Sequence, residues 1–240
     1  MSIKGILFDL YGTLLDIETD ESMEEIYRGI AHFLTYHGID LHRWEVRDLY
    51  YRIMKHQKEQ SQEEFPEINV ESIWVAFLAQ QGVKESPSRK KLSLTLAQLY
   101  RGLSRKRLQL YPHVKRILDE LKSAYHLALI SDAQACFALP EMRAMSLEGY
   151  FDPVVISSGY GFRKPDPRLI QDALSMMSLA PAEVISIGND MYRDIYGANR
   201  LGIKTILFLS NQGTQSHEET AADYVVTQFE DVLKGVEALS

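Results

Sequence analysis

The chain opens with a near-continuous apolar run from Ile3 to Phe8, without the alternation of a half-exposed strand. Such a run predicts a strand that is covered on both faces, as in parallel sheets. It stops at Asp9, which a turn at Gly12 and the hydroxyl of Thr13 follow. The pattern therefore places a carboxylate at the carboxyl end of a buried strand.

Between residues 16 and 107 the apolar positions recur at three- and four-residue steps, which is typical of amphipathic helices. No convincing strand is visible in this stretch. Helices are predicted over residues 23–34, 41–60, 70–80 and 91–103, with Gly38 and Gly82 as stops after the first and third.

From Leu108 onward short apolar runs alternate with amphipathic segments, the signature of a parallel sheet built from βαβ units. Strands are predicted over 126–131, 154–157, 184–188, 204–209 and 223–226, and helices over 113–124, 139–147, 165–178, 191–201 and 229–239. Asp166 is expected to act as the N-cap of the third of these helices. The first strand needs these later strands as partners. The fold class is therefore α/β: a Rossmann-like, doubly wound parallel sheet from residues 1–15 and 108–240, with a helical domain inserted at 16–107.

Charge and cysteine content narrow the class of protein. The 26 Lys and Arg against 33 Asp and Glu give a net charge of −7, without a basic tract, so a nucleic-acid partner is not expected. The apolar stretch at the N-terminus is interrupted by Asp9 and Asp16, which argues against a signal peptide or a membrane span. The single cysteine, Cys136, fits a reducing compartment. We expect a cytoplasmic protein, and nothing in the sequence fixes its oligomeric state.

Polar groups follow three of the later strands as well. Ser131-Asp132 follows one, Lys164-Pro165 comes shortly after the next, and Gly188-Asn189-Asp190 ends a third, with Asp194 four residues on. In a parallel sheet these ends meet Asp9 at one edge, where α/β proteins bind ligands. A carboxylate, a hydroxyl, a fixed cation and further carboxylates then form one coherent site.

The order of these motifs resembles the haloacid dehalogenase superfamily over essentially the whole chain. Asp-x-x-Gly-Thr-Leu comes first, Ser next, Lys-Pro third, and an acidic cluster before Gly197-Ala198 last. The insert at 16–107 resembles that superfamily's helical cap, which closes over small substrates. The resemblance implies that Asp9 attacks the substrate and forms a covalent intermediate. Thr13 and Ser131 would hydrogen-bond the transferring group, and Lys164 would neutralise the charge.

The acidic cluster predicts a metal. Carboxylates about 4 Å apart repel by roughly 1–4 kcal/mol and raise one another's pKa values, whereas a divalent cation between them removes the conflict. Oxygen ligands suit Mg²⁺. By resemblance, the ligands would be Asp9, the backbone carbonyl of Tyr11 and an Asp of the last motif. Asp190 is the first choice for that Asp, with Asp194 as a second ligand or outer-shell partner.

Tyr11 departs from the superfamily's phosphatases, which carry a second Asp at this position for acid–base catalysis. A Tyr resembles the 2-haloacid dehalogenase branch, which needs no metal, and Asp132 departs from both branches, where Asn is usual. Three interpretations follow. The favoured one is a Mg²⁺-dependent phosphohydrolase of a small metabolite, in which Tyr11 or a water that it holds replaces the missing carboxylate. The others are a 2-haloacid dehalogenase and a silent member that binds ligand without turnover.

The insert is expected to select a small anionic substrate. Its basic candidates are Arg43, Arg47, Lys55 and His56. A water-excluding lid needs two flexible crossings, which we expect near residues 16–18 and 106–109.

Overall fold

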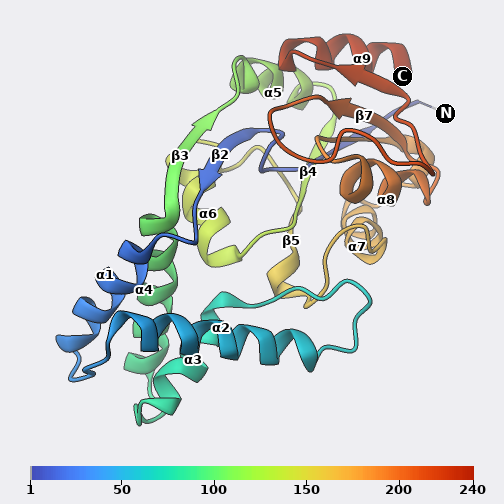
Figure 1. Ribbon diagram of the computed structural model, residues 1–240. Helices are drawn as coiled ribbons and strands as arrows, with labels where there is room; N and C mark the ends of the chain where they lie inside the picture. The colour runs from blue at the N-terminus through green and yellow to red at the C-terminus, as the bar shows by residue number, and fades with distance from the viewer. Residues whose placement is uncertain (1) are drawn as a thin grey trace.

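The computed structural model describes residues 2–240 and has two parts, an α/β core and a helical insert (Figure 1). The core is built on a parallel sheet in the order β5-β4-β1-β6-β7-β8. Its strands are β1 (Gly5–Phe8), β4 (His126–Ser131), β5 (Val154–Ile156), β6 (Val184–Gly188), β7 (Lys204–Phe208) and β8 (Tyr224–Val226). The predicted α/β fold class is confirmed.

Both faces of β1 are buried, as its apolar run requires. Ile6 and Phe8 pack on one side with α5 (Val114–Lys122) and α9 (Val232–Leu239), whereas Leu7 packs on the other with α7 (Arg168–Met177). Because β4 and β6 are the neighbours of β1, the residues that follow these strands lie next to Asp9. The sheet order thus positions the site.

Four helices form the insert and gather at one end of the molecule (Figure 1). They are α1 (Glu24–Thr35), α2 (Arg43–Glu59), α3 (Val70–Gln80) and α4 (Pro87–Ser104). They surround their own apolar core, which includes Tyr27, Tyr50, Trp74 and Tyr100. Phe137 of α6 (Ala135–Ala144), a helix of the α/β part, also packs into this core.

The expectation that residues 16–107 lack strands is wrong at both ends. β2 (Leu15–Thr19) and β3 (Arg105–Leu110) form an antiparallel ribbon with Asp16 opposite Gln109. The two segments that connect the core to the insert are therefore hydrogen-bonded to each other, whereas the sequence predicts two separate flexible connections.

Several predicted helix limits also need correction. α4 begins at Pro87, because Ser86 accepts a hydrogen bond from the backbone N–H of Arg89 and caps the helix. α6 begins at Ala135, four residues before the predicted start. α7 begins at Arg168 with Pro167 as its N-cap residue, although the Asp166 carboxylate does accept from the N–H of Arg168. The helix predicted over 191–201 is a π-helix, Met191–Tyr196, followed by α8 (Gly197–Asn199).

Candidate active site

Asp9 lies directly after β1 and is almost fully buried, with 9% of its surface exposed. Its Oδ1 accepts a hydrogen bond of 2.7 Å from the Lys164 ammonium, and its Oδ2 accepts one of 3.0 Å from the Thr13 hydroxyl. The structure thus brings together three of the residues that the sequence predicts. Burial raises the pKa of Asp9 to about 6 against the opposing pull of Lys164, so the carboxylate is mostly ionised at neutral pH.

Lys164 is buried and bridges two carboxylates. Its Nζ lies 2.7 Å from Asp9 and 2.5 Å from Asp194, and it also donates to the carbonyl of Ile130 at 3.2 Å. Burial alone would lower the pKa of this ammonium, but Asp194 and Asp9 raise it above its usual range. Lys164 is therefore a fixed cation at neutral pH.

Asp194 lies in the π-helix and is positioned by the backbone of the turn after β6. Its Oδ2 accepts hydrogen bonds of 3.0 Å from the N–H groups of Asn189 and Asp190, while its Oδ1 faces Lys164. A Cβ on Gly188 would lie 2.3 Å from the Cβ of Asp194, so only glycine permits this close approach. Asp194 therefore holds Lys164 in place, and the positive charge of Lys164 faces both Asp194 and Asp9.

Asp190, the first choice for a metal ligand, is turned away from Asp9. Its carboxylate accepts hydrogen bonds from the N–H groups of Tyr192, Arg193 and Thr214 and from the Arg193 side chain. Burial would raise the pKa of Asp190, but these bonds more than offset that effect and lower it. The residue acts as a helix cap.

Asn189 occupies the place beside the nucleophile instead. Its Oδ1 lies 3.1 Å from the Thr13 hydroxyl, which also binds Asp9. The amide is clamped between two glycines: a Cβ on Gly12 would lie 2.3 Å from its Nδ2, and one on Gly213 would lie 2.6 Å from the same atom. Asn189 and Asp190 differ by one position in the sequence, and only the structure separates their roles.

Ser131 and Asp132, at the end of β4, hold buried oxygens without partners. The hydroxyl of Ser131 and the Oδ2 of Asp132 make no hydrogen bond among residues 2–240. The other oxygen of Asp132 accepts from the N–H of Lys164 at 2.9 Å. A buried polar group without a partner costs about 1–3 kcal/mol, so both oxygens are suited to a ligand that supplies the missing bond.

Two adjoining cavities border Asp132, whereas Ser131 lines neither of them. A polar one of about 170 Å³ lies at the nucleophile, and one of about 280 Å³ lies between the α/β core and the insert; they share Tyr11, Asp132 and Arg193. The smaller cavity is lined by Asp9, Tyr11, Asp132, Lys164, Asn189, Arg193, Asp194 and Gln212.

The basic side chains at the larger cavity are not the expected ones. Arg101, Arg163 and Arg193 line it, whereas Arg43, Arg47, Lys55 and His56 do not. Sequence reasoning missed Arg101 and Arg193. Arg193 lies between Asp190 and Asp194, so its place in the acidic motif was a usable signal.

Tyr11 is held in a buried network that the sequence did not indicate. Its hydroxyl donates to the Glu141 carboxylate, which also accepts bonds of 2.8 and 3.1 Å from Arg101. Arg105 adds a bond of 3.1 Å to the same carboxylate. Burial and Glu141 raise the pKa of Tyr11 above its usual range. A lone acidic residue on the buried side of α6 was the available signal for Glu141.

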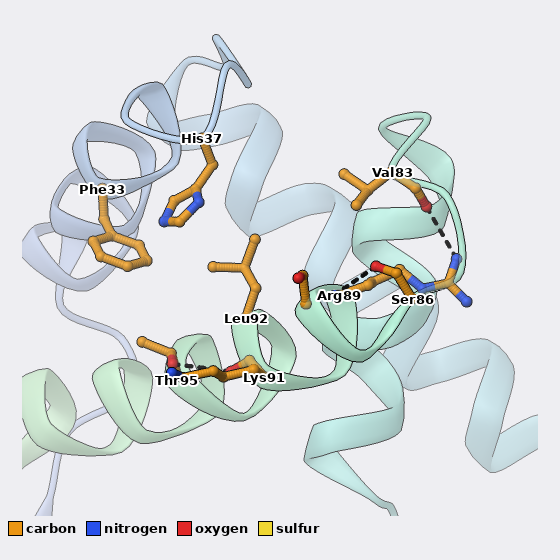
Figure 2. Close-up of a pocket in the computed structure, with 9 residues that line it drawn as sticks. Phe33, His37, Val83, Ser86, Arg89, Lys91, Leu92 and Thr95 are labelled. Carbon is orange, nitrogen blue, oxygen red and sulfur yellow. Dashed lines mark hydrogen bonds between the residues drawn. The ribbon is translucent and has the colours of Figure 1, made fainter.

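A further cavity, of about 390 Å³, lies within the insert (Figure 2). Phe33 of α1 and His37, in the turn after α1, face Leu92 of α4 across it, as Figure 2 shows. It shares no residue with the polar cavity at Asp9 or with the larger cavity beside it. The site with the reactive groups is therefore the one between the two parts.

The donors at the nucleophile meet only some of the needs of Mg²⁺. Within residues 2–240 no three His, Cys, Asp or Glu side chains converge as a metal site. Asp9 and Asn189 nevertheless present side-chain oxygens that share Thr13 as a partner, and Tyr11, whose carbonyl is the predicted third ligand, lines the same cavity. Mg²⁺ is commonly held by one or two carboxylates together with substrate phosphates. The donors thus fit a magnesium ion that protein and phosphate hold jointly.

The profile of the haloacid dehalogenase-like hydrolases matches residues 6–208. The chain belongs to this family. It is therefore a hydrolase of the haloacid dehalogenase type, and the resemblance noted in its motifs is confirmed.

Relatives in this hydrolase family are named either as phosphatases or as dehalogenases. A glyceraldehyde 3-phosphate phosphatase of Methanocaldococcus jannaschii is 25% identical over 99% of this chain and 98% of its own. An (S)-2-haloacid dehalogenase of Burkholderia cepacia is 27% identical over 92% of this chain and 88% of its own. The phosphatase of Pyrococcus furiosus is 31% identical, but the match spans about half of each protein, 51% of this chain and 52% of the relative.

Solved structures of the family share the fold. A 2-haloacid dehalogenase from Pseudomonas syringae pv. Tomato superposes with a TM-score of 0.70, at 20% identity and over 98% of both chains. Among residues 2–240, no helix combines the length and apolar character that a membrane crossing needs.

Proposed function

We propose that this hydrolase is a phosphohydrolase of a small anionic metabolite and forms an aspartyl-phosphate on Asp9. The observation that carries the proposal is the polar cavity at Asp9, where a buried carboxylate meets a fixed ammonium beside Asp132, whose Oδ2 makes no hydrogen bond within residues 2–240. A phosphoryl group has several oxygens that accept hydrogen bonds, and the Lys164 ammonium and the Arg193 guanidinium that line this cavity can donate to them. The cytoplasmic location expected from Cys136 stays a prediction.

Asp9 supplies the nucleophile. One of its carboxylate oxygens forms a bond to phosphorus as the bond from phosphorus to the leaving-group oxygen breaks. Water then attacks phosphorus, the bond to Asp9 breaks, and inorganic phosphate leaves. Burial raises the pKa of Asp9 only to about 6, so the carboxylate is available for attack at neutral pH.

Lys164, Thr13 and Ser131 stabilise the charge of the transferring group. Lys164 stays protonated and is held against Asp9 by Asp194, so its charge is in place before substrate binds. The Ser131 hydroxyl is buried without a partner among the described residues but lines neither cavity, so its hydrogen bond to a phosphoryl oxygen is inferred from the family motif alone. Groups that are fixed in advance cost no reorganisation during the reaction.

Asp9, Asn189 and the carbonyl of Tyr11 would hold Mg²⁺ together with the phosphate. When bound, the ion neutralises negative charge on the phosphoryl oxygens. Asp190 does not belong to our proposed ligand set, because its carboxylate is used by backbone N–H groups and Arg193. Asp194 acts from outside the set, through Lys164.

The larger cavity supports a small substrate with a second polar or anionic group. Its volume is about 280 Å³, and Arg101, Arg163 and Arg193 line it. The relatives named as glyceraldehyde 3-phosphate phosphatases act on a compound of this class, to judge by their names. We therefore expect a phosphorylated metabolite of a few carbon atoms.

A 2-haloacid dehalogenase is the second candidate, and two residues favour it. Tyr11 stands where phosphatases of the family carry an acid–base carboxylate, and Asn189 provides a neutral oxygen where a metal favours a charged one. A halide needs no proton to leave, so the acid–base carboxylate that Tyr11 replaces is not required. The dehalogenase branch also needs no metal, so a charged ligand in place of Asn189 is not required either.

The deciding experiment is release of p-nitrophenol from p-nitrophenyl phosphate, with Mg²⁺ and with EDTA. We expect metal-dependent release by the wild type and no release above background by Asp9→Asn. Halide release from 2-chloropropanoate without metal is measured in parallel and would instead establish the dehalogenase. Absence of both activities in a folded protein would leave the silent, ligand-binding interpretation.

A further inference from the structure

Tyr11 is badly placed to move protons in this site. Its hydroxyl donates to Glu141, and Arg101 and Arg105 hold that carboxylate in turn. A proton given to the substrate would have to leave this buried, fully bonded network. The residue two positions after the nucleophile therefore offers no general acid, a role typically worth 10²- to 10⁴-fold in rate.

Asp132 borders the same two cavities as Tyr11, but one oxygen of its carboxyl group is not bonded to any side chain or backbone group of residues 2–240. It lines the cavity at Asp9 and also the larger cavity where the leaving group would lie. Of the carboxylates in residues 2–240, it alone lines both, because Asp9 and Asp194 border only the first cavity and Glu21 and Glu67 only the second.

One oxygen of Asp132 is fixed and the other has no partner. Oδ1 accepts a hydrogen bond of 2.9 Å from the N–H of Lys164, which sets the direction of the side chain. Oδ2 is buried without a hydrogen bond. A carboxyl group that is held by one oxygen and unbonded at the other is arranged for proton exchange with a ligand.

The charges around Asp132 have both signs. Lys164 and Arg193 face it as cations, and Asp9, Asp194 and Glu67 influence it or are influenced by it as carboxylates. Burial outweighs Lys164 and raises the pKa of Asp132. This shift brings the protonated form closer to the working pH, which a general acid requires.

We propose that Asp132 is the general acid and base of the reaction, in place of the carboxylate that Tyr11 replaces. In the first step, protonated Asp132 gives its proton to the leaving-group oxygen as that oxygen separates from phosphorus and Asp9 bonds to phosphorus. In the second step, ionised Asp132 takes a proton from water as the water oxygen bonds to phosphorus and the bond to Asp9 breaks. Asp132 ends protonated, as it began. This inference rests on the proposed phosphohydrolase function.

The test is a rapid-mixing comparison of the wild type and Asp132→Asn with p-nitrophenyl phosphate and Mg²⁺. p-Nitrophenolate leaves without a proton, so the variant should still form the intermediate and fail at its hydrolysis. We expect a burst of about one p-nitrophenolate per protein molecule, then steady turnover reduced by 10²- to 10³-fold. Acid quenching should trap the phosphorylated protein, which mass spectrometry detects.

A second substrate separates proton transfer from positioning. Glycerol phosphate has an alkoxide leaving group that needs the proton, so Asp132→Asn should lose its burst and more of its turnover on this substrate. Asp132→Glu keeps a carboxyl group and should recover part of the activity. Asp223→Asn, which alters a hydrogen-bonding carboxylate beside Thr205 outside both cavities, is the control for folding and turnover.

Two results would overturn the assignment of Asp132. One is turnover of Asp132→Asn within about twofold of the wild type. The other is an equal loss on both substrates with no trapped intermediate, which indicates a positioning role. Failure of the proposed function looks different, because the wild type itself would then release no p-nitrophenol.

Discussion

Asn189 and Asp190 are neighbours in the chain, but their side chains bond to different partners. Asp190 uses its carboxylate on the backbone N–H groups that begin the π-helix, whereas the side-chain amide of Asn189 contacts Thr13 and lines the cavity at Asp9. The proposed magnesium set therefore contains one carboxylate, that of Asp9. Such a set should bind free Mg²⁺ weakly and gain affinity when phosphate adds oxygens.

Asn189→Asp should raise the affinity for free Mg²⁺ at least tenfold, because it adds a negative charge beside Asp9. Titration calorimetry with MgCl₂ measures the change directly. The matched control is Asp190→Asn, which removes a charge one residue away and should alter the Mg²⁺ affinity less than threefold. A larger loss in the control than gain in the test variant would return Asp190 to the ligand set.

At the scale of single residues, the sequence predicts those site residues whose positions are set by the ends of strands. Asp9, Thr13 and Lys164 meet because they follow parallel strands that end at one edge of the sheet. Those strands are visible in the sequence as short apolar runs that alternate with amphipathic helical segments. The side-chain directions in the turn after β6 depend on which backbone N–H groups need an acceptor. The sequence does not show which side chain these N–H groups will take as acceptor. A carboxylate is the better metal ligand, so the sequence alone favours Asp190 over Asn189 as the ligand.

The turn after β1 is an element on which the site depends. Gly12 has a φ of +90°, and its missing side chain makes room for the amide of Asn189. Both features require glycine. The turn thus holds the Thr13 hydroxyl where it contacts both Asp9 and Asn189.

Gly12→Ala should lower turnover by tenfold or more and destabilise the fold by about 1–3 kcal/mol, because the new Cβ would lie 2.3 Å from Asn189 Nδ2. Steady-state kinetics and urea unfolding measure the two effects. Gly38→Ala is the control: Gly38 has a φ of +73° after α1, and a Cβ added there would meet no atom within 4 Å. It should lose about 1 kcal/mol of stability and keep wild-type turnover. Equal turnover of the two variants would contradict the role given to Gly12.

The ribbon of β2 and β3 is the element that the sequence concealed. Its strands are polar and half-exposed, and they pair across about ninety residues of chain. Periodicity reports only on neighbours in sequence, so an isolated pair of this kind gives no signal. The helices of the insert, in contrast, bury wide apolar stripes and are visible from spacing alone.

The whole molecule is joined at more places than two crossings. Besides the ribbon, the loop between α2 and α3 bonds to the loop before α7 through the N–H of Glu67 to Gly161 and the N–H of Arg163 to Phe65. Arg101 of α4 reaches Glu141 of α6 as a third link. Gln134 also bonds to Ile68 and Val70, and the Ser157 hydroxyl donates to Glu67. We propose that residues 16–107 move as a cap only when all these links except the ribbon release.

Arg101→Met should destabilise the protein by about 3 kcal/mol, at the lower end for a broken buried pair, because Arg105 still partly compensates Glu141. Arg47→Met is the matched control, since the Arg47–Asp48 pair is exposed and is expected to contribute less than about 1 kcal/mol. Urea unfolding provides both values. Equal losses would show that the link between α4 and α6 contributes little to stability.

Glu141 is the point where the insert and the nucleophile loop meet, because its carboxylate binds Arg101 on one side and Tyr11 on the other. Moving Arg101 away would change the partner that holds Tyr11, two residues from Asp9. Coupling of this kind is reciprocal: a ligand that tightens the loop at Asp9 must shift the opening equilibrium of the insert by the same factor. If the insert opens as proposed, phosphate bound at Asp9 would change the position of α4 through Tyr11, Glu141 and Arg101.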